Sequence, residues 1–334
     1  MSQRFPIWPW IVAAALLTMH GSAMVCAAQE NGSTAQTEFH ASSPVTDTMQ
    51  QEWALVEAHN YPAAERQLAE YVKAHPNSAD AHFLLGYVYY REQRPKDSLA
   101  EYTTGAELRN PNANDLAVVS MDYILLRDYT DADKWLTKAT QWSPDNALYW
   151  YYLGRTKNNE FQFKDAVEAF RQCLKLHPLD IRAEYNLGLA YAGLARNDDA
   201  ALAYRTAIEW QASDVRRDPQ PYLDMGELLL AEEKPGEAIP YLQQASVLDG
   251  KNPTFHEQLA RAYERTGNLK AAETEFNRAI TLAPNVPALH YQLGRVYGKE
   301  GVADKAKEEF ARYAALNSTQ ASDLTGTPNP TSND

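Results

Sequence analysis

Residues 153–188 read LGRTKNNEFQFKDAVEAFRQCLKLHPLDIRAEYNLG, and this stretch begins and ends on the same residue pair, Leu-Gly. Similar pairs, a large apolar residue followed by a small one, recur at intervals of 34, 34, 34, 38, 34 and 34 residues. A fixed period of this length indicates a repeat array, in which each unit buries its apolar face against its neighbours. The pairs are Leu85-Gly86, Val119-Ser120, Leu153-Gly154, Leu187-Gly188, Met225-Gly226, Leu259-Ala260 and Leu293-Gly294.

The spacing of apolar residues inside each repeat predicts two antiparallel helices. With the large residue of each pair counted as position 7, the repeats start near residues 79, 113, 147, 181, 219, 253 and 287. Positions 4, 7, 8 and 11 form one helical stripe, and positions 20, 24 and 27 form another. Small residues at positions 8 and 20 allow close approach of the helix axes, and a large residue at position 24 fills the flank. Position 24 is Tyr102, Leu136, Phe170, Tyr204, Leu242, Phe276 and Phe310.

This pattern resembles the tetratricopeptide repeat (TPR) over residues 79–318. The resemblance implies an all-α, right-handed superhelical solenoid of helix-turn-helix repeats. Residues 48–76 match it at Ala64, Leu68 and Tyr71, although Gln51 and Glu52 replace the apolar-small pair. Terminal repeats are atypical because one face meets water. We therefore interpret 48–76 as a degenerate capping repeat.

The segments outside the array differ in composition. Residues 1–28 have a short basic start, an apolar run and small residues, in the order typical of a cleaved signal peptide. A retained membrane anchor and a segment without a targeting role are the alternatives. Residues 29–47 and 319–334 are rich in small and polar residues and are expected to be disordered. The sequence thus predicts an exported protein, periplasmic or extracellular.

The formal net charge of −13 disfavours nucleic acid and anionic membranes as partners. Membrane contact is expected only if the N-terminal segment is retained as an anchor. Once residues 1–28 are removed, Cys173 is the one remaining cysteine, so no internal disulfide can form. Cys173 stands at position 27 and is expected to be a small buried apolar residue.

The sequence carries no motif of a catalytic, cofactor or metal site: it lacks a Gly-rich phosphate loop, G-x-S-x-G, H-E-x-x-H and paired cysteines. We therefore predict no enzyme activity and no cofactor. His82, His256 and His290 all stand at position 4. Equivalent residues of stacked helices lie roughly 8–10 Å apart, which is awkward for one metal ion. These histidines are expected to flank the core.

The resemblance implies that positions 2, 5, 9, 12 and 13 line a concave groove. Early repeats then present apolar and aromatic side chains there, and the last two present more cations than carboxylates. We expect Glu257 and Glu264 to pair locally with arginines of their own repeat, whereas Arg295 and Lys299 have no acidic neighbours at groove positions. The candidate groove residues are Phe83, Tyr87, Tyr90, Met121, Ile124, Tyr151, Arg155, Arg182, Arg261, Arg265, Tyr291, Arg295 and Lys299.

Such a groove suits an extended peptide with apolar side chains and an acidic or carboxylate-bearing segment. The sequence favours a non-catalytic scaffold that binds a protein or peptide. The alternative is a glycan- or small-ligand-binding solenoid, or an accessory subunit of an envelope enzyme complex. Aromatic residues at helical spacing also occur as packing between repeats, and charged residues as a solvated surface. The oligomeric state stays open.

Two departures from the repeat give further expectations. The 38-residue interval places four extra residues near 211–220, either in a longer helix or loop or as a change of the superhelical path. Lys157 stands at position 11, where the other repeats carry Tyr or Leu, and Glu184 stands at position 4 of the next repeat. We predict an ion pair between Lys157 and Glu184.

Overall fold

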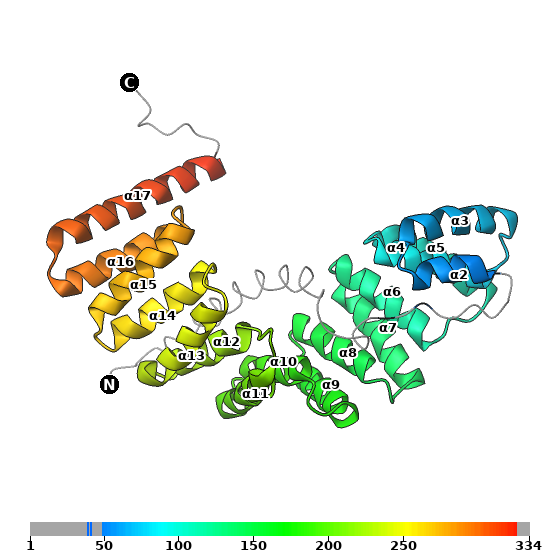
Figure 1. The fold of residues 1–334 in the computed structure, drawn as a ribbon, viewed down its shortest axis with the longest axis horizontal. Helices are drawn as coiled ribbons and strands as arrows, with labels where there is room; N and C mark the ends of the chain where they lie inside the picture. Colours follow the sequence, from blue (N-terminus) through cyan, green and yellow to red (C-terminus); the bar gives the residue numbers. More distant parts are fainter. Residues whose placement is uncertain (1–38, 40, 42–48, 326–334) are drawn as a thin grey trace, which may run out of the picture. The chain divides into compact units, whose positions relative to one another are not determined.

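The computed structural model describes residues 39, 41 and 49–325 (Figure 1). Residues 1–28, the expected signal peptide, lie outside the described residues, as do most of 29–47 and all of 326–334. Within the described ranges the chain forms sixteen α-helices, one 3-10 helix and no strand, which confirms the all-α expectation. The elements are α2 (Gln50–Glu57), α3 (Tyr61–Ala74), α4 (Ala79–Arg91), α5 (Pro95–Leu108), α6 (Ala113–Leu125), α7 (Tyr129–Trp142), α8 (Ala147–Asn159), α9 (Phe163–Leu176), α10 (Ile181–Gly193), α11 (Asn197–Trp210), η2 (Gln211–Ser213), α12 (Gln220–Ala231), α13 (Pro235–Leu248), α14 (Pro253–Arg265), α15 (Leu269–Leu282), α16 (Pro287–Glu300) and α17 (Ala303–Thr325).

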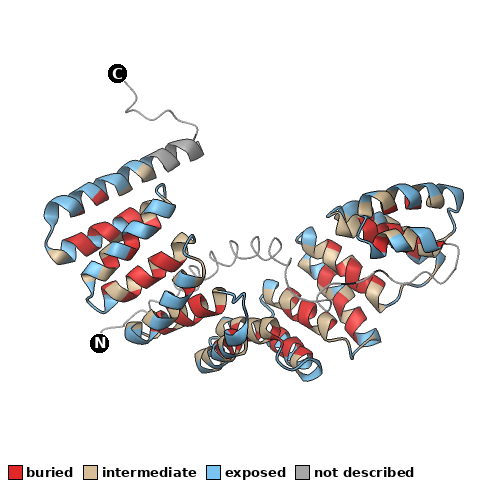
Figure 2. Cartoon of the chain, viewed as in Figure 1, coloured by how far each residue is buried: buried red, intermediate tan, exposed pale blue. Residues whose placement is uncertain are grey.

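The chain divides into two compact units. The N-terminal unit, Met1–Leu126, contains α2 to α6, and the C-terminal unit, Arg127–Asp334, contains α7 to α17. Inside each unit every helix packs on the next one along the chain. Figure 2 shows that the buried residues of each helix gather on the sides that face its neighbours. Each unit therefore builds its core as a series of adjacent interfaces, as expected for a repeat array.

The close approach predicted between positions 8 and 24 is confirmed. A Cβ atom on Gly154 would lie 2.7 Å from the ring of Phe170, and one on Gly188 would lie 2.6 Å from the ring of Tyr204. Gly86 in the N-terminal unit faces Tyr102 in the same way, at 2.8 Å. Any side chain at these positions would displace the large residue that packs on the glycine.

Residues at position 4 tie the first helix of a repeat to the loop before it. The ring Nδ1 of His256 lies 2.7 Å from a carboxylate oxygen of Glu275 on α15, and its Nε2 lies 3.2 Å from the carbonyl oxygen of Gly250. His82 and His290 make the same two contacts in their own repeats. Trp150 donates its indole N–H to the carbonyl of Pro144, 2.8 Å away. The expectation that these histidines flank the core is confirmed, because each is at most 6% exposed.

The turn between the two helices of a repeat always contains one residue with positive φ. These residues recur with the spacing of the repeats, and only the last two are glycine. The non-glycine residues have φ between 55° and 60°, a region that costs roughly 1–2 kcal/mol for an L-residue. The turn closes with a backbone bond such as that from Arg196 N to Tyr191 O, 2.9 Å. The residues are His59, Gln93, Arg127, Phe161, Ala195, Glu233, Gly267 and Gly301.

The four extra residues of the 38-residue interval lie in a loop. Helix α11 keeps the 14-residue length of other second helices, and the 3-10 helix η2 follows it. Gln211 is 2% exposed, and its side-chain amide bonds both the N–H and the carbonyl of Asp218, at 2.8 and 3.0 Å. The Gln211 side chain therefore closes the loop and joins its two ends.

The last helix is longer than the sequence predicts. Helix α17 continues to Thr325 and so includes residues 319–325, which the sequence analysis assigns to a disordered tail. These residues contain no glycine or proline; Gly326 and Pro328 follow, and both disfavour helix. Most described side chains of α17 are exposed (Figure 2).

Among the described residues, no helix combines the length and apolar character needed to cross a membrane.

Candidate partner-binding surface

The candidate groove residues lie on the first helices of the repeats: α4 and α6 in the N-terminal unit, and α8, α10, α14 and α16 in the C-terminal unit. We call the positions 2, 5, 9, 12 and 13 of the first helices the first-helix face. The face is described separately for each unit.

Phe83 packs inside the N-terminal unit. It is 3% exposed and its ring lies against Gly105, where a Cβ atom would be 2.9 Å from the ring. Its centroid is 5.7 Å from that of Tyr102, and the Arg109 guanidinium lies 4.8 Å from it. Phe83 differs in this respect from the expected groove residue: repeat position predicts the direction of a side chain, and the small residue Gly105 allows the ring to sink into the core.

Tyr87 makes the most informative contact of the N-terminal unit. Its hydroxyl donates to the backbone carbonyl of Phe39, 3.0 Å away, and accepts from Nη1 of Arg91 at 2.9 Å. The Arg91 guanidinium also lies 4.9 Å from the centroid of the Tyr61 ring. Tyr87 and Phe39 are each 3% exposed, and the ring of half-buried Tyr90 is 6.1 Å from that of Tyr87. A residue from outside the helical array is thus held on the first-helix face.

Phe39 corrects one expectation, because it lies in the predicted disordered linker 29–47 and is nevertheless buried. It is the only Phe, Tyr or Trp in that stretch, which is the signal that could have singled it out. Burying an aromatic ring releases free energy that offsets the cost of fixing this residue. Met121 and Ile124, on the adjacent α6, are partly buried.

In the C-terminal unit the first candidate residues form a cluster of aromatic rings and cations. Tyr151 is 4% exposed and lies edge-on to Tyr152, with centroids 5.2 Å apart. The guanidinium carbon of Arg182 lies 4.7 Å from the Tyr151 centroid, and that of Arg155 lies 5.7 Å from it. Arg182 also pairs with Asp180 at 3.4 Å. The structure brings Tyr151, Arg155 and Arg182 together, as cations stacked near an aromatic ring.

A group of carboxyl side chains follows on α12 and α14, and two of its members, Asp224 and Glu227, are not predicted from the sequence. Tyr185 donates its hydroxyl to Asp224 at 2.5 Å, and the Gln220 amide donates to the other oxygen at 3.1 Å. Burial raises the pKa of Asp224 to about 6 and that of Glu227 to about 7. Burial likewise raises the pKa of Glu257. Glu227 stands at groove position 9, so its position in the repeat could have identified it.

Arg295 and Lys299 correct the expectation that they lack acidic neighbours. Glu264, on the preceding first helix, lies 3.1 Å from Nη2 of Arg295 and 2.8 Å from Nζ of Lys299. The Glu264 side chain is 5% exposed, whereas the two cations are 43% and 48% exposed. The carboxylate is therefore buried under its two partners. The pairing joins positions far apart in sequence, which neighbour rules within one helix cannot reveal.

The remaining candidates of the C-terminal unit also have partners. Arg261 donates to Gln258 at 3.2 Å, and Arg265 donates to the carbonyl oxygen of Leu230. Tyr291 is 42% exposed and its ring lies 5.2 Å from that of Tyr313 on α17. The last helix therefore covers part of the ring of Tyr291.

The predicted ion pair between Lys157 and Glu184 is wrong. Nζ of Lys157 lies 2.9 Å from a carboxylate oxygen of Asp133 on α7 and 2.9 Å from Oε1 of Gln162. Burial raises the pKa of the Glu184 carboxyl. The long Lys157 side chain reaches the preceding second helix, because that helix already offers a carboxylate at contact distance.

The thiol of Cys173 is part of the packed core. Cys173 is 1% exposed, as expected, and burial raises the pKa of its thiol to about 12. In the described part of the chain, no group of three or more His, Cys, Asp or Glu side chains is placed to hold a metal ion.

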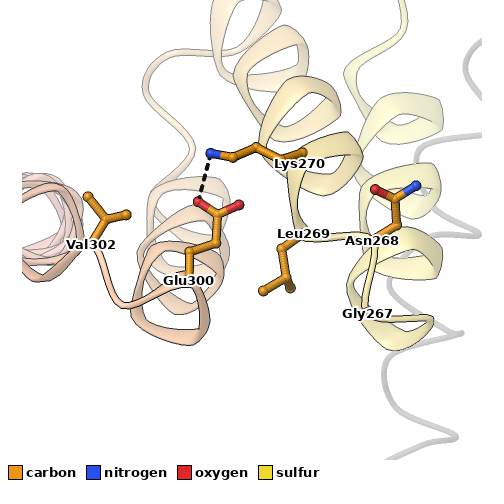
Figure 3. Close-up of a pocket in the computed structure, with 6 residues that line it drawn as sticks. All are labelled: Gly267, Asn268, Leu269, Lys270, Glu300 and Val302. Atoms are coloured by element: carbon orange, nitrogen blue, oxygen red, sulfur yellow. Dashed lines mark hydrogen bonds and ion pairs between the residues drawn. The ribbon is translucent and has the colours of Figure 1, made fainter.

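A surface pocket at the turns of the last repeats lies apart from the first-helix candidates. It is lined by Gly267, Asn268, Leu269, Lys270, Glu300 and Val302, and none of these is a candidate groove residue (Figure 3). Lys270 spans it to reach Glu300 at 3.2 Å.

Together these observations define a helical-hairpin repeat array with polar and aromatic contacts along its first helices. A model of the tetratricopeptide repeat matches residues 53–113, 162–219 and 223–287, more than half of the chain. The chain therefore belongs to the tetratricopeptide-repeat family. Such arrays serve in general as scaffolds for protein interaction.

Curated relatives share this array over part of their length. The chain is 29% identical over 170 residues to the human protein O-mannosyl-transferase TMTC3, a match that covers 47% of this chain and 19% of that protein. It is 21% identical over 269 residues to the mouse PEX5-related protein, covering 77% of this chain and 43% of that protein. The chain thus spans less than half the length of these relatives.

Solved structures share the fold. The C-terminal part of a TPR repeat-containing protein from Cytophaga hutchinsonii superposes with a TM-score of 0.59 at 16% identity, covering 72% of this chain and 97% of that one. A chain of the APC/C hetero-tetramer Cut9-Hcn1 gives 0.51 at 15% identity, covering 77% of this chain and 50% of that one.

Proposed function

We propose that the chain is an exported, non-catalytic scaffold that binds an extended segment of a partner protein on its first-helix face. The contact between Tyr87 and Phe39 is the observation that carries the proposal. A backbone carbonyl accepts the Tyr87 hydroxyl while the attached side chain is buried, which is how extended peptides are recognised in general. A glycan offers no peptide carbonyl and no phenyl ring, so this contact favours a peptide over the glycan-binding alternative.

The charges of the C-terminal unit extend the proposal to a second part of the partner. Arg155 and Arg182 stack near Tyr151, and Arg295 and Lys299 share one buried carboxylate, Glu264. Two cations against one carboxylate leave one positive charge in excess at the latter site. This arrangement supports binding of an acidic or carboxylate-bearing segment there.

The non-catalytic part of the proposal rests on what the reactive side chains do. His82, His256 and His290 have both ring nitrogens in contact with fixed oxygen atoms. A thiol with a pKa of about 12, like that of Cys173, stays protonated near neutral pH and is a poor nucleophile. The transferase activity named for TMTC3 is therefore not extended to this chain.

The peptide-binding role can be tested by selecting ligands from a random peptide library on the full chain. The affinity of the selected peptides is then compared between two forms of the chain that both lack the Phe39 ring, Phe39→Ala and Phe39→Ala with Tyr87→Phe, so that the chain's own contact at Tyr87 does not compete and only one hydroxyl differs. We expect a loss of about 5- to 10-fold, the effect of one hydrogen bond in a buried site. Tyr263→Phe is the matched control, because the Tyr263 hydroxyl bonds Gln243 at the surface of α13. Failure to select any peptide, together with binding on a glycan array, would instead establish the alternative.

Export is a separate proposal, supported by the signal-like composition of residues 1–28. Cell fractionation followed by N-terminal sequencing would test it. We expect the protein in the periplasmic or extracellular fraction, beginning at residue 28 or 29. An intact residue 1 in the cytosolic fraction would contradict it, and an intact residue 1 in the membrane fraction would favour the anchor.

A further inference from the structure

Phe39 is ten positions before Met49, the residue that precedes α2. It is 3% exposed, a depth of burial shared with the core residues Tyr87 and Tyr152. A residue of the segment before the array is therefore buried to the same depth as the core of the array itself.

The Tyr87 hydroxyl is oriented for this contact. Arg91, one helical turn further along α4, donates to the hydroxyl oxygen at 2.9 Å, and the hydroxyl donates its own proton to the carbonyl of Phe39. The Arg91 guanidinium is in turn placed over the Tyr61 and Tyr87 rings, at 4.9 and 5.9 Å from their centroids. Residues of α3 and α4 thus fix the position of the Tyr87 hydroxyl, which donates to the carbonyl of Phe39.

The two parts of the contact select different properties of a ligand. The bond to a backbone carbonyl is available to any extended chain, whereas the buried ring selects an aromatic side chain. The selectivity of the site therefore depends on the ring.

We propose that Phe39 of the chain itself is the resident ligand of the first-helix face of the N-terminal unit, and that the external partner is a peptide whose aromatic residue displaces it. This inference rests on the proposed function and adds the chemistry of the partner and a device that regulates its access. Phe39 acts as a tethered competitor.

The size of the effect follows from the tether. A short tether gives a ligand an effective concentration on the order of 1 mM. If the segment alone binds with a Kd of about 100 µM, its presence weakens an external peptide for the same site by roughly tenfold. Removing the Phe39 ring should restore that affinity.

The test uses a fluorescent synthetic peptide with the sequence of residues 35–43 and the full chain, in wild-type and Phe39→Ala forms. Fluorescence anisotropy should show the peptide binding Phe39→Ala about tenfold more tightly than the wild type. A peptide in which the phenylalanine is replaced by alanine should not bind Phe39→Ala. Adding Tyr87→Phe to Phe39→Ala should weaken binding of the original peptide again.

Trp142→Ala is the matched control, because it removes an aromatic ring that is 49% exposed in the C-terminal unit. It should bind the peptide as the wild type does, and circular dichroism should show that all variants keep their helices. Equal affinity of wild type and Phe39→Ala, or no binding to Phe39→Ala, would overturn the inference.

The two proposals fail in distinguishable ways. If library-selected peptides bind wild type and Phe39→Ala equally well, the partner-binding role stands and self-occupancy is wrong. If the chain's own peptide binds Phe39→Ala but the library yields no ligand, self-occupancy stands and the general peptide-binding role is wrong.

Discussion

The first-helix faces of the two units carry different kinds of side chain on the same type of helix. In the N-terminal unit, Phe83 and Tyr87 are each 3% exposed, and the latter holds the backbone of Phe39. In the C-terminal unit, Arg295 and Lys299 are nearly half exposed and are held by the buried carboxylate of Glu264. The helical framework is shared, whereas the side chains at the groove positions differ.

This difference shows that the burial of aromatic side chains and the ion pairing of charged ones determine which groups a partner can contact. Phe83 packs into the core against Gly105, and the Tyr87 hydroxyl is already bonded to the carbonyl of Phe39, so a ligand gains access to Tyr87 only by replacing that contact. Charged side chains stay near water and are available in proportion to the charge that their partners leave unbalanced. A partner would therefore be recognised by the fit of its aromatic side chain in the N-terminal unit and by its net charge in the C-terminal unit.

The largest expected effect concerns Asp122, a carboxyl buried inside the N-terminal unit. It is 0% exposed, Ser98 donates to it at 2.5 Å, and burial raises its pKa from 3.8 to about 8. The folded state therefore holds the proton more tightly than the unfolded state. The wild type should lose stability as pH rises from about 4 to 8, and the loss is complete above pH 8.

Asp122→Asn removes this pH dependence because the amide stays neutral. We expect it to be roughly 3–5 kcal/mol more stable than the wild type at pH 9 and nearly equal at pH 4, since each pKa unit corresponds to about 1.4 kcal/mol. Urea unfolding at both pH values measures the difference. Asp165→Asn, at an exposed carboxyl of the C-terminal unit, is the control and should change little. A wild type as stable at pH 9 as at pH 4 would contradict the expectation.

The second prediction tests whether the framework is equivalent in both units. Gly86→Ala and Gly188→Ala place a Cβ atom 2.8 and 2.6 Å from the rings of Tyr102 and Tyr204. Both should destabilise the chain by about 1–3 kcal/mol through overpacking. Gly298→Ala meets nothing within 4 Å and should stabilise by about 0.5–1 kcal/mol through helix propensity. Thermal unfolding checks all three, and tolerance at only one of the first two would show that the units pack differently.

The third prediction concerns the charges of the C-terminal unit. Glu264→Gln leaves Arg295 and Lys299 without their carboxylate, so we expect a loss of about 1–2 kcal/mol, reduced by the exposure of both cations. The same change should tighten binding of an acidic peptide, and the gain should shrink with added salt. Glu308→Gln is the control, because Glu308 is 60% exposed where it pairs with Arg312. Calorimetric titration that shows no gain in acidic-peptide affinity would exclude this site as a charge-recognising surface.

The smallest expected effect compares turns early and late in the array. Ala195→Gly should stabilise the chain by about 0.5–1 kcal/mol, because Ala195 is exposed and has φ 55°. Gly301→Ala, at φ 77°, should destabilise by about 1 kcal/mol. Thermal unfolding of the two variants should therefore move in opposite directions, and a shift in the same direction would contradict the role assigned to φ.

The sequence predicted the framework because the framework is periodic. Gly154 and Phe170 stand at fixed offsets, so their contact follows from helix geometry. The depth of Phe83 depends on Gly105, outside that pattern. The pairing of Glu264 with Lys299 joins different repeats. Lys157 pairs with Asp133 and not with Glu184, because the carboxylate that a long side chain contacts depends on distance and not on repeat position. Phe39 lies outside the array, where periodicity carries no information.

The amide of Gln211 has a practical consequence for work with this protein. Because its two bonds to Asp218 join the ends of the loop, the exposed residues between them, 212–217, are separated from the packing of α11 and α12. Exposed loop tips of this kind tolerate added sequence. An epitope or a fluorescent reporter inserted there would label the C-terminal unit while leaving the first helices that carry the candidate contacts unchanged.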